Sequence, residues 1–398
     1  MHPAPVRISD LVEKDISAKL HVLTLTPFYP SDGDDVSGCF VAETLRALKS
    51  SGVASSVIAV DTIYHPLRKP SQQDPAQWIR YPQLPGNFGL SSAGSFLGAT
   101  ILTKVRQFHR LSPIDVIHAH APLPCGHAAA FLSKRLGIPF VVTIHGLDVF
   151  NACFQQGVAA NWRRRAAVSV YKSARRVICI SEKVRRLLTA GIGEGVSTKV
   201  VYNGTDPTLF VPGTACDETP NILIVGNLLA GKGQELVMQA FARVKQTYTG
   251  LQIRMIGDGA DRNRFEALAQ HLGIRDQVHF LGRRSRMEVA EAMRNCTVFA
   301  LPSRYEGLGC VYLEAMACGK PVIACRDQGI EEIIRHGSNG WLIPVDGIEE
   351  LVQGLQVLLG DTALRGRIGQ AARQTILDSL TMSRQAEMLA TVYEEVVR

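Results

Sequence analysis

The chain has 398 residues, of which 46% are hydrophobic and 20% charged, a composition typical of a globular protein of two or three domains. No apolar run reaches the length of about 18 residues that a membrane span needs, and the N-terminal segment lacks the apolar core of a signal peptide. We therefore expect neither a transmembrane helix nor a secretory signal. Nine scattered cysteines without a C-x-x-C pair favour reduced thiols in a cytoplasmic protein over a disulfide framework.

The net charge of +7 is unevenly distributed along the chain. Residues 1–200 contain 23 Lys+Arg and 13 Asp+Glu, a balance of +10, whereas residues 201–398 contain 20 and 23, a balance of −3. Between positions 163 and 186, nine basic residues accompany one acid, Glu182. This stretch predicts either a solvated helix face or attraction to an anionic membrane surface or lipid phosphate. With few aromatic residues and no nucleic-acid-binding motif, it argues against a nucleic-acid partner.

Short apolar segments alternate with helical stretches along the chain, a pattern that predicts α/β domains with parallel sheets. The segment Ile63–Leu90 has no clear periodicity and holds five prolines, so we expect a long loop there. The predicted strands of the first half are His21–Thr26, Ser56–Val60, Asp115–His118, Pro139–Thr143 and Val177–Ile180.

A segment rich in Pro, Gly and Thr, Tyr202–Thr219, predicts a linker between two similar halves. We therefore expect two Rossmann-like domains facing across a cleft, residues 1–202 and 203–380, followed by a helical segment over 381–398. Ligands in such sheets bind at the carboxyl ends of the strands. The predicted strands of the second half are Asn221–Val225, Leu251–Ile256, Gln277–Phe280, Val298–Ala300, Pro321–Ala324 and Trp341–Ile343.

The residues most indicative of function lie between positions 302 and 344. Glu306 and Glu314 stand eight positions apart, with glycines after the first and a predicted helix, Cys310–Cys318, carrying the second. A helix start behind a glycine loop offers free N–H groups and the positive end of the helix dipole, which suits a phosphate. The two carboxylates are themselves negative and do not favour a phosphate, so they are better suited to accept hydrogen bonds from ligand hydroxyls. A ligand with many hydroxyls and a diphosphate is a sugar nucleotide.

This segment, with its EGLG loop and EAMACGKPV run, resembles the retaining family 4 glycosyltransferases of the GT-B fold, and the resemblance extends over roughly residues 20 to 395. It implies transfer of a sugar from a nucleotide diphosphate to an acceptor hydroxyl, with Glu314 binding the ribose and Glu306 near the reacting sugar. It also implies that the helical segment 381–398 crosses back to the N-terminal domain. The backbone that holds the sugar and the diphosphate would come from Gly307, Leu308, Gly309 and Cys310.

The loop VGNLLAGKGQE contains the start of a Walker A motif, Gly226–Lys232. The next residue is Gly233, so the magnesium-binding hydroxyl is missing and we reject a P-loop. The resemblance implies instead that Lys232 binds the donor diphosphate and stabilises the departing charge. Asn227 belongs to the same donor-binding loop but stands where the family commonly has Arg. The candidate replacements for that charge are Arg283, Arg284 and Arg286.

Three residues in other turns are candidates on the same resemblance. Gly38, before a predicted helix, would face the donor diphosphate, and Gly257 lies in the similar turn IGDGADR. Both have a simpler interpretation as ordinary strand-to-helix turns. His145, in TIHGLDVF, would act near the donor sugar and the acceptor hydroxyl; the alternative is a hydrogen-bonded histidine at a strand end.

The sequence contains no convincing metal site. His118, His120 and His127 lie close in sequence, but no Cys or carboxylate completes a set at familiar spacing. We therefore interpret them as core or supporting histidines. The expected reaction is metal-independent and needs no cofactor, because the nucleotide sugar is a co-substrate.

The expected pathway is the assembly of a cell-envelope polysaccharide or glycolipid. The acceptor would be a glycan or a lipid-linked glycan, and the enzyme would be cytoplasmic, peripherally bound at the inner face of the plasma membrane. Two alternatives remain open on the sequence. One is a UDP-sugar 2-epimerase of the same fold, and the other is a non-catalytic sugar-nucleotide-binding protein.

Overall fold

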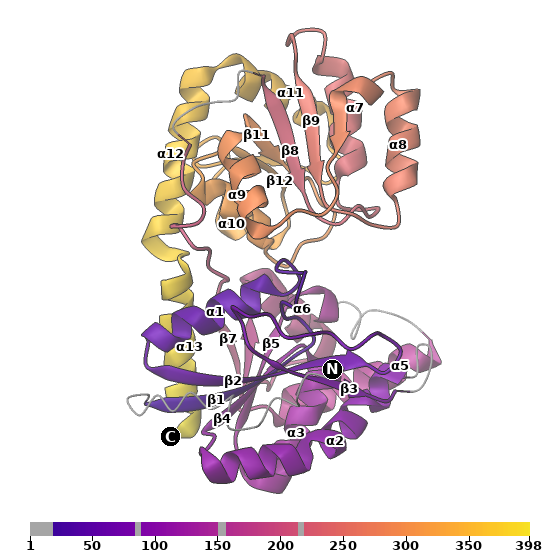
Figure 1. Ribbon diagram of the computed structural model, residues 1–398. Helices are drawn as coiled ribbons and strands as arrows, with labels where there is room; N and C mark the ends of the chain where they lie inside the picture. Colours follow the sequence, from indigo (N-terminus) through magenta and orange to yellow (C-terminus); the bar gives the residue numbers. More distant parts are fainter. Residues whose placement is uncertain (1–18, 84–88, 150–156, 214–218) are drawn as a thin grey trace. The chain divides into compact units, whose positions relative to one another are not determined.

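The computed structural model describes residues 19–83, 89–149, 157–213 and 219–398. The chain divides into two compact units, Met1–Tyr202 with Ser383–Arg398, and Asn203–Met382 (Figure 1). Three sequence predictions extend beyond the described residues: the N-terminal segment, positions 84–88 of the predicted long loop and positions 214–218 of the predicted linker. Among the described helices, none is long and apolar enough to cross a membrane.

The first unit contains a seven-stranded sheet in which every pair of neighbouring strands is parallel. The strand order, β3-β2-β1-β4-β5-β6-β7, is that of a Rossmann fold extended by one strand. The strands are β1 (Leu20–Thr26), β2 (Val53–Thr62), β3 (Gln77–Tyr81), β4 (Val116–His120), β5 (Phe140–Ile144), β6 (Arg176–Cys179) and β7 (Thr198–Val200).

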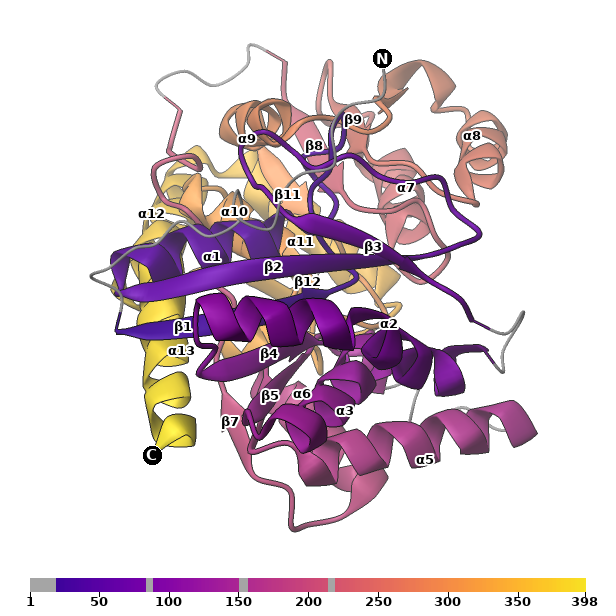
Figure 2. The ribbon, with the colours of Figure 1, turned by 60° about the horizontal axis from the view of Figure 1, so that its bottom comes forward.

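Helices cover both faces of this sheet. Figures 1 and 2 show α1 and α13 on one face and α2 and α3 on the other. The helical elements are α1 (Cys39–Ser50), α2 (Gly89–Leu111), the short η3 turn (Pro122–Gly126), α3 (His127–Leu136), α5 (Val158–Ser173), α6 (Glu182–Ile192) and α13 (Met382–Val397).

Helix α13 completes the core of the first unit, although it is formed by the last residues of the sequence. Its buried Leu389 packs in one apolar cluster with Val22 of β1 and Val141 of β5. Burial of one such side chain stabilises a protein by about 1.5–3 kcal/mol. The hydroxyl of the fully buried Tyr393 lies 2.7 Å from Nδ1 of His118 on β4.

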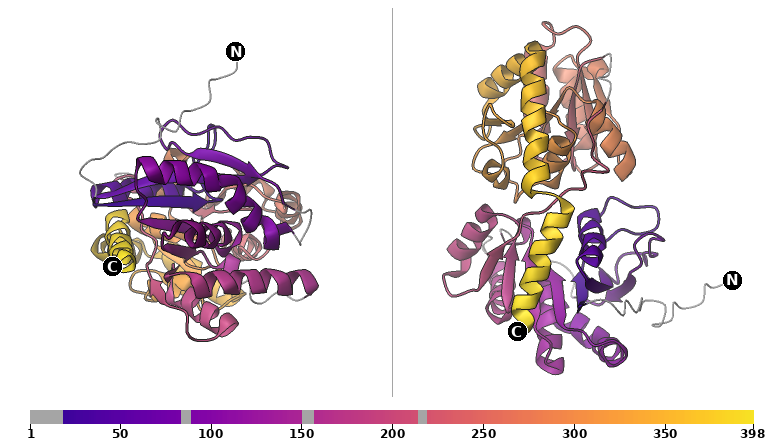
Figure 3. Two further views of the ribbon diagram at one scale, coloured as in Figure 1. Left: turned by 90° about the horizontal axis from the view of Figure 1, so that it is seen from below. Right: turned by 90° about the vertical axis from the view of Figure 1, so that its left-hand side faces the viewer.

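The second unit contains a six-stranded parallel sheet of order β10-β9-β8-β11-β12-β13. Its strands are β8 (Asn221–Val225), β9 (Gln252–Ile256), β10 (Val278–Phe280), β11 (Val298–Ala300), β12 (Val322–Cys325) and β13 (Trp341–Ile343). Its helical elements are α7 (Gln234–Val244), α8 (Arg262–His271), η4 (Arg275–Gln277), α9 (Arg286–Asn295), α10 (Cys310–Ala317), η5 (Gly329–Glu332), α11 (Ile348–Gly360) and α12 (Thr362–Ser379). Figure 3 shows α12 leading into α13 after a short break.

All eleven predicted strands are present, because each is a short buried apolar run, and three of them (β8, β11 and β13) have the predicted bounds. The prediction of one long loop over Ile63–Leu90 is wrong, because this segment contains the edge strand β3. In β3, buried Ile79 and Tyr81 alternate with exposed Arg80. A five-residue strand beside prolines is too short for this alternation to predict a strand from the sequence. The three-residue edge strand β7 was missed for the same reason.

Candidate active site

Helix α10 begins directly behind the glycine loop of the second unit, as the sequence indicated. Gly309 precedes the helix with φ 84°, and a Cβ at this position would lie 2.5 Å from the Tyr312 ring. Only glycine fits this conformation without displacing that ring. Gly307 and Leu308 are buried and Cys310 is partly exposed, so the side chain of Leu308 belongs to the core. The loop can therefore offer a ligand its backbone and the positive end of the helix dipole.

Glu314 lies on the buried side of α10 and forms an ion pair inside the second unit. Its Oε1 accepts a hydrogen bond from Nη1 of Arg286 at 2.7 Å, and both side chains are largely buried. The guanidinium of Arg286 also lies over the ring of Phe210, 4.9 Å from its centroid. The other carboxylate oxygen, Oε2, is buried and has no hydrogen-bond partner among the described residues. A buried carboxylate oxygen without a donor is costly, so it is well suited to accept from a ligand hydroxyl.

Lys232 and Glu306 meet although they are 74 residues apart. Nζ of Lys232 lies 2.6 Å from Oε1 of Glu306, and their side chains are 25% and 13% exposed. The buried Ser303 hydroxyl lies 3.3 Å from the same carboxylate oxygen. Gly233, with φ 87°, packs closely on this segment, since a Cβ there would lie 2.4 Å from the Pro302 carbonyl oxygen. The turn that begins α7 thus brings a cation to the loop before α10.

A third segment, after β12, fixes the backbone of Glu306. The backbone N–H of Glu306 donates to Oε1 of Gln328 at 2.9 Å, and the Gly329 N–H donates to the Glu306 carbonyl at 3.2 Å. A Cβ at Gly329 would lie 1.8 Å from the carbonyl oxygen of Gly307, so glycine is required. The sequence analysis missed this contribution of Gln328. The only available signal was its place beside a glycine immediately after a predicted strand.

The other candidates of the second unit have structural explanations that do not need a ligand. Gly257 has φ 132°, and a Cβ there would lie 2.0 Å from the carbonyl oxygen of Gly226, so the packing of two turns already requires glycine. Asn227 is exposed, and its carbonyl accepts from the Gln234 side chain at 2.8 Å.

Two of the three candidate arginines do not replace the charge that Arg would supply at position 227. Arg286 pairs with Glu314, and Arg284 lies 3.0 Å from the Glu288 carboxylate. Each of these two positive charges is therefore already balanced by a carboxylate.

In the first unit, the structure brings Gly38 and His145 to one region through two phenylalanines. Gly38 has φ 74°, and a Cβ there would lie 2.2 Å from the carbonyl carbon of Phe28. The ring of Phe28 contacts that of His145 with centroids 5.6 Å apart, and Phe40 at the start of α1 does so at 5.1 Å. His145 follows the end of β5, where its backbone N–H lies 3.0 Å from both carboxylate oxygens of Asp148. Burial raises the pKa of Asp148 to about 6.

Three histidines form a row at the carboxyl ends of β4 and β5. Nδ1 of His120 lies 3.1 Å from Nε2 of His145, and the two rings stack with centroids 5.3 Å apart. His118 stacks on His120 at 4.5 Å. Burial lowers the pKa of His145 to about 4 and that of His118 to about 3, so both are neutral at pH 7. His127 lies apart on α3, with Nε2 3.4 Å from the Ser95 hydroxyl.

Within the described ranges, no group of three or more His, Cys, Asp or Glu side chains has the geometry of a metal site. No disulfide joins the seven cysteines that these ranges contain.

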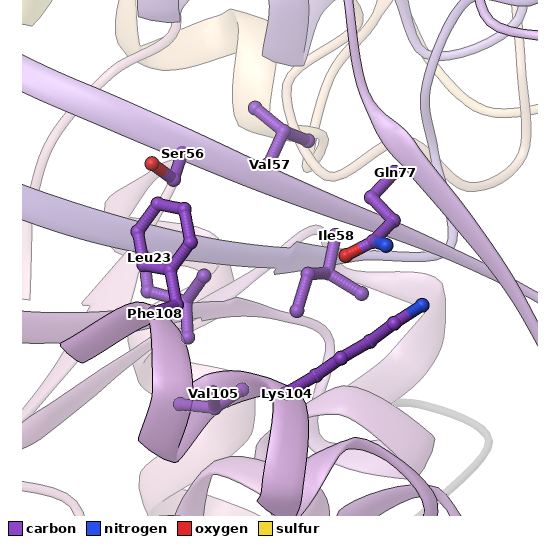
Figure 4. Close-up of a pocket in the computed structure, with 8 residues that line it drawn as sticks. All are labelled: Leu23, Ser56, Val57, Ile58, Gln77, Lys104, Val105 and Phe108. Atoms are coloured by element: carbon purple, nitrogen blue, oxygen red, sulfur yellow. The ribbon is translucent and has the colours of Figure 1, made fainter. Parts of the chain in front are cut away.

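The first unit also contains a small pocket between α2 and strands β1, β2 and β3. Its volume is about 20 Å³, enough for about one water molecule. Figure 4 shows the side chain of Lys104 along one side, with its amino end toward Gln77. The cavity is too small for a nucleotide sugar. Its lining residues are Leu23, Ser56, Val57, Ile58, Gln77, Lys104, Val105 and Phe108.

Comparison with known proteins identifies the family. The model of "Glycosyltransferase Family 4" matches residues 38–209, and that of "Glycosyl transferases group 1" matches residues 209–375. The chain is 28% identical to alpha-D-kanosaminyltransferase of Streptomyces kanamyceticus, over 80% of this chain and 88% of that protein. It is 27% identical to N-acetyl-alpha-D-glucosaminyl L-malate synthase of Bacillus anthracis, over 75% and 79%.

Solved structures show the same fold at low sequence identity. Sucrose-phosphate synthase of Thermosynechococcus elongatus superposes with a TM-score of 0.75 at 21% identity, over 95% of this chain and 99% of that one. HepE of Anabaena, solved with UDP and glucose, also gives 0.75 at 21% identity, over 94% and 100%. With its two Rossmann-like units and matches to both family models, the chain belongs to the family 4 glycosyltransferases of the GT-B fold.

Proposed function

We propose that this glycosyltransferase moves a sugar from a nucleotide diphosphate to an acceptor hydroxyl with retention of the anomeric configuration. The observation that carries the proposal is the buried Oε2 of Glu314, which has no hydrogen-bond partner among the described residues and lies on a helix that starts at a glycine loop. A carboxylate oxygen that lacks a donor is suited to a sugar hydroxyl, and a helix start is suited to a phosphate. Both features occur in the second unit, together with the Lys232–Glu306 pair.

Each residue of this unit has a distinct proposed role. Glu314 accepts hydrogen bonds from the ribose hydroxyls, while Arg286 holds its other oxygen in place. Glu306 binds the transferred sugar, and the backbone from Gly307 to Cys310 binds the sugar and the diphosphate. Lys232 stabilises the negative charge that develops on the departing phosphate, which is electrostatic stabilisation of the transition state.

Other proposed contacts come from turns with less specific sequences. In the second unit, Asn227 and Gly257 contribute backbone contacts to the donor. In the first unit, Gly38 provides backbone for the diphosphate, and His145 acts near the reacting hydroxyls.

Retention is proposed to arise by attack on the face from which the leaving group departs. The acceptor oxygen bonds to the anomeric carbon while the bond from that carbon to the phosphate oxygen breaks. The acceptor proton passes to the departing phosphate, so no enzyme-bound sugar forms. This route suits the site because Glu306, proposed to lie near the reacting sugar, already forms an ion pair with Lys232.

The proposed donor is a UDP-sugar, used without a metal ion or a cofactor. HepE was solved with UDP and glucose, and its fold matches this chain over nearly its whole length. The names of the two relatives quoted above describe aminosugar transfer, so UDP-activated aminosugars belong among the donors to be tried. The proposed acceptor is a glycan or lipid-linked glycan of the cell envelope, met at the inner face of the plasma membrane. The basic stretch between residues 163 and 186 supports an anionic surface as partner.

Thermal unfolding with a panel of UDP-, GDP- and ADP-sugars tests donor binding. A ligand present at 100 times its dissociation constant stabilises the folded protein by about 2.7 kcal/mol. We expect the UDP-sugars to stabilise the wild type and to stabilise Glu314→Gln much less. Stabilisation by none of the three series would contradict the proposal.

Incubation of the stabilising donor with and without acceptor extracts then tests the reaction. NMR of the product would report the anomeric configuration, which we expect to match the donor. Release of a 2-epimer without an acceptor would indicate the epimerase instead. Binding without turnover would indicate the non-catalytic protein.

A further inference from the structure

The strongest unassigned feature of the first unit is the contact between His120 and His145. Their rings are nearly parallel, with an interplanar angle of 10°, and Nδ1 of His120 lies 3.1 Å from Nε2 of His145. This distance fits an N–H···N hydrogen bond. His145 carries a proposed role near the reacting hydroxyls, whereas no contact with a substrate is proposed for His120.

We infer that His120 is a positioning residue, which fixes the ring orientation and the tautomer of His145. The inference rests on the proposed function only for its effect on catalysis, because the contact itself is a property of the structure. Since Nε2 of His145 is occupied by His120, Nδ1 is the ring nitrogen left for a substrate. Among the described residues, no hydrogen bond engages that Nδ1 atom.

His120 can act in this way because its own ring is held from the other side. His118 stacks on it with centroids 4.5 Å apart. His118 is fixed in turn by two hydrogen bonds of 2.7 Å, one between Nδ1 and the Tyr393 hydroxyl and one between Nε2 and the Thr143 hydroxyl. Thr143 lies on β5, the strand that leads to His145. A series of contacts therefore connects Tyr393 on α13, through His118 and His120 on β4, to His145.

Burial keeps the three histidines uncharged. Only a neutral histidine has two distinct tautomers, so the tautomer of His145 matters here. Burial lowers the pKa of His120 well below the usual value, with smaller contributions from the neighbouring His118 and His145 rings. A neutral histidine has one N–H and one bare nitrogen, so a hydrogen bond at Nε2 determines the state of Nδ1. If His120 donates, Nδ1 of His145 is a donor; if His120 accepts, Nδ1 of His145 is an acceptor. In either arrangement the tautomer of His145 is coupled to that of His120 through this hydrogen bond.

Nuclear magnetic resonance of protein labelled with ¹⁵N-histidine tests the contact without any substrate. We expect one tautomer for His145, and a scalar coupling between its Nε2 and Nδ1 of His120 across the hydrogen bond. His145→Asn assigns the signals. Absence of the coupling together with a mixture of His145 tautomers in the wild type would overturn the inference.

Two variants separate the hydrogen bond from the packing. His120→Phe keeps a ring beside His118 but removes Nδ1, and we expect it to release His145 into a mixture of tautomers. His120→Asn places an amide group where Nδ1 was, so it should restore one tautomer. His21→Asn is the matched control, since it removes another partly buried histidine that hydrogen-bonds Ser56, and it should leave the His145 signals unchanged.

Kinetics on the same variants tests the consequence for transfer. A neutral hydrogen bond corresponds to about 2- to 13-fold in rate, so His120→Phe should lower kcat by that factor and change the donor KM less. His120→Asn should recover most of the loss. An unchanged kcat in His120→Phe, with an unchanged His145 tautomer, would contradict the inference. If the wild type transfers no sugar at all, the proposed function fails, while the NMR coupling still decides the role of His120.

Discussion

Nζ of Lys232 lies 2.6 Å from Oε1 of Glu306. The two residues belong to different loops of the second unit, one before α7 and one before α10, and Ser303 contacts the same carboxylate oxygen. The charges therefore offset each other in the structure. On the proposed mechanism, a diphosphate that arrives at this loop shares the lysine with Glu306, and its negative charge grows as the sugar departs.

Lys232→Ala should weaken transfer without unfolding the protein. A charge-assisted hydrogen bond contributes about 1.5–3 kcal/mol, which corresponds to roughly 10- to 150-fold in kcat/KM. Steady-state kinetics and thermal unfolding measure the two quantities separately. Arg243→Ala is the matched control, because Arg243 pairs with Glu349 at the exposed surface of the same unit. Full activity in Lys232→Ala would remove this lysine from the mechanism.

Glu314→Gln should raise the donor KM more than it lowers kcat, because the ribose lies away from the bond that breaks. Glu306→Ala should also lower kcat, since this residue is proposed to contact the transferred sugar. Kinetics at varied donor concentration distinguishes the two effects. Glu349→Gln removes an exposed carboxylate of the same unit and should change neither constant. The reverse pattern in the two variants would exchange the proposed roles of Glu314, which binds the ribose, and Glu306, which binds the transferred sugar.

The sequence predicted the sheets better than the site. Buried apolar strands can be read from local pattern, whereas the edge strands β3 and β7 are too short or too polar. The donor-site residues were predicted from a family resemblance. The contacts that these residues make with distant parts of the chain could not be predicted. Arg286 pairs with Glu314 across 28 positions, and His118 meets Tyr393 across 275. Such contacts depend on how helices fold back on a sheet, and local periodicity in the sequence does not predict this.

Chelators should leave transfer intact. Where a P-loop has a magnesium-binding hydroxyl, this chain has Gly233, and that glycine packs so closely on the Pro302 carbonyl that a side chain has no room there. Lys232 and the start of α10 are proposed to balance the diphosphate charge instead. Initial rates with EDTA, and with EDTA followed by excess magnesium, measure the dependence. A loss of activity that magnesium restores would show that the reaction needs a metal ion.

The first unit should lose stability as the pH falls from 7 to 5. In the unfolded chain His118, His120 and His145 gain protons near pH 6.5, whereas burial lowers their folded pKa values, to about 3 for His118 and about 4 for His145. Unfolding therefore takes up protons in this range, and acid favours the unfolded chain. Asp148, with its pKa raised to about 6, acts in the opposite direction, but one carboxyl opposes three histidines.

Urea unfolding at pH 7 and pH 5 measures this effect through the fluorescence of Trp78 and Trp162. The background variant Trp341→Phe removes the tryptophan of the second unit, so that the signal comes from the first unit alone. His120→Asn removes one of the three titrating rings, so its loss of stability between the two pH values should be smaller. Equal stability of the reference protein at both values would show that the row is not buried and neutral in solution.

The first unit should bind anionic vesicles in a salt-sensitive manner through α5 and its neighbours. On α5, Val158 and Trp162 lie four positions apart on one helix face and are 79% and 49% exposed. Arg165, Lys172 and Arg175 are also exposed, on or just after the same helix. Each basic residue near an anionic surface contributes about 1 kcal/mol, within a Debye length of about 8 Å at physiological salt. Three or four such residues beside exposed apolar side chains suffice for reversible attachment.

Co-sedimentation with vesicles containing phosphatidylserine, at low and high salt, tests this prediction. Arg164 is left unchanged in the test variant, because its guanidinium donates to the Gly191 carbonyl at 2.8 Å and so supports the fold. Changing Arg165, Lys172 and Arg175 to Ser should release the protein from vesicles while leaving its thermal unfolding unchanged. Changing three exposed basic residues of α2, Lys104, Arg106 and Arg110, removes the same charge and should leave binding largely intact. If the wild type stays in the supernatant at low salt, the basic stretch is a solvated helix face, and a soluble acceptor becomes the better expectation.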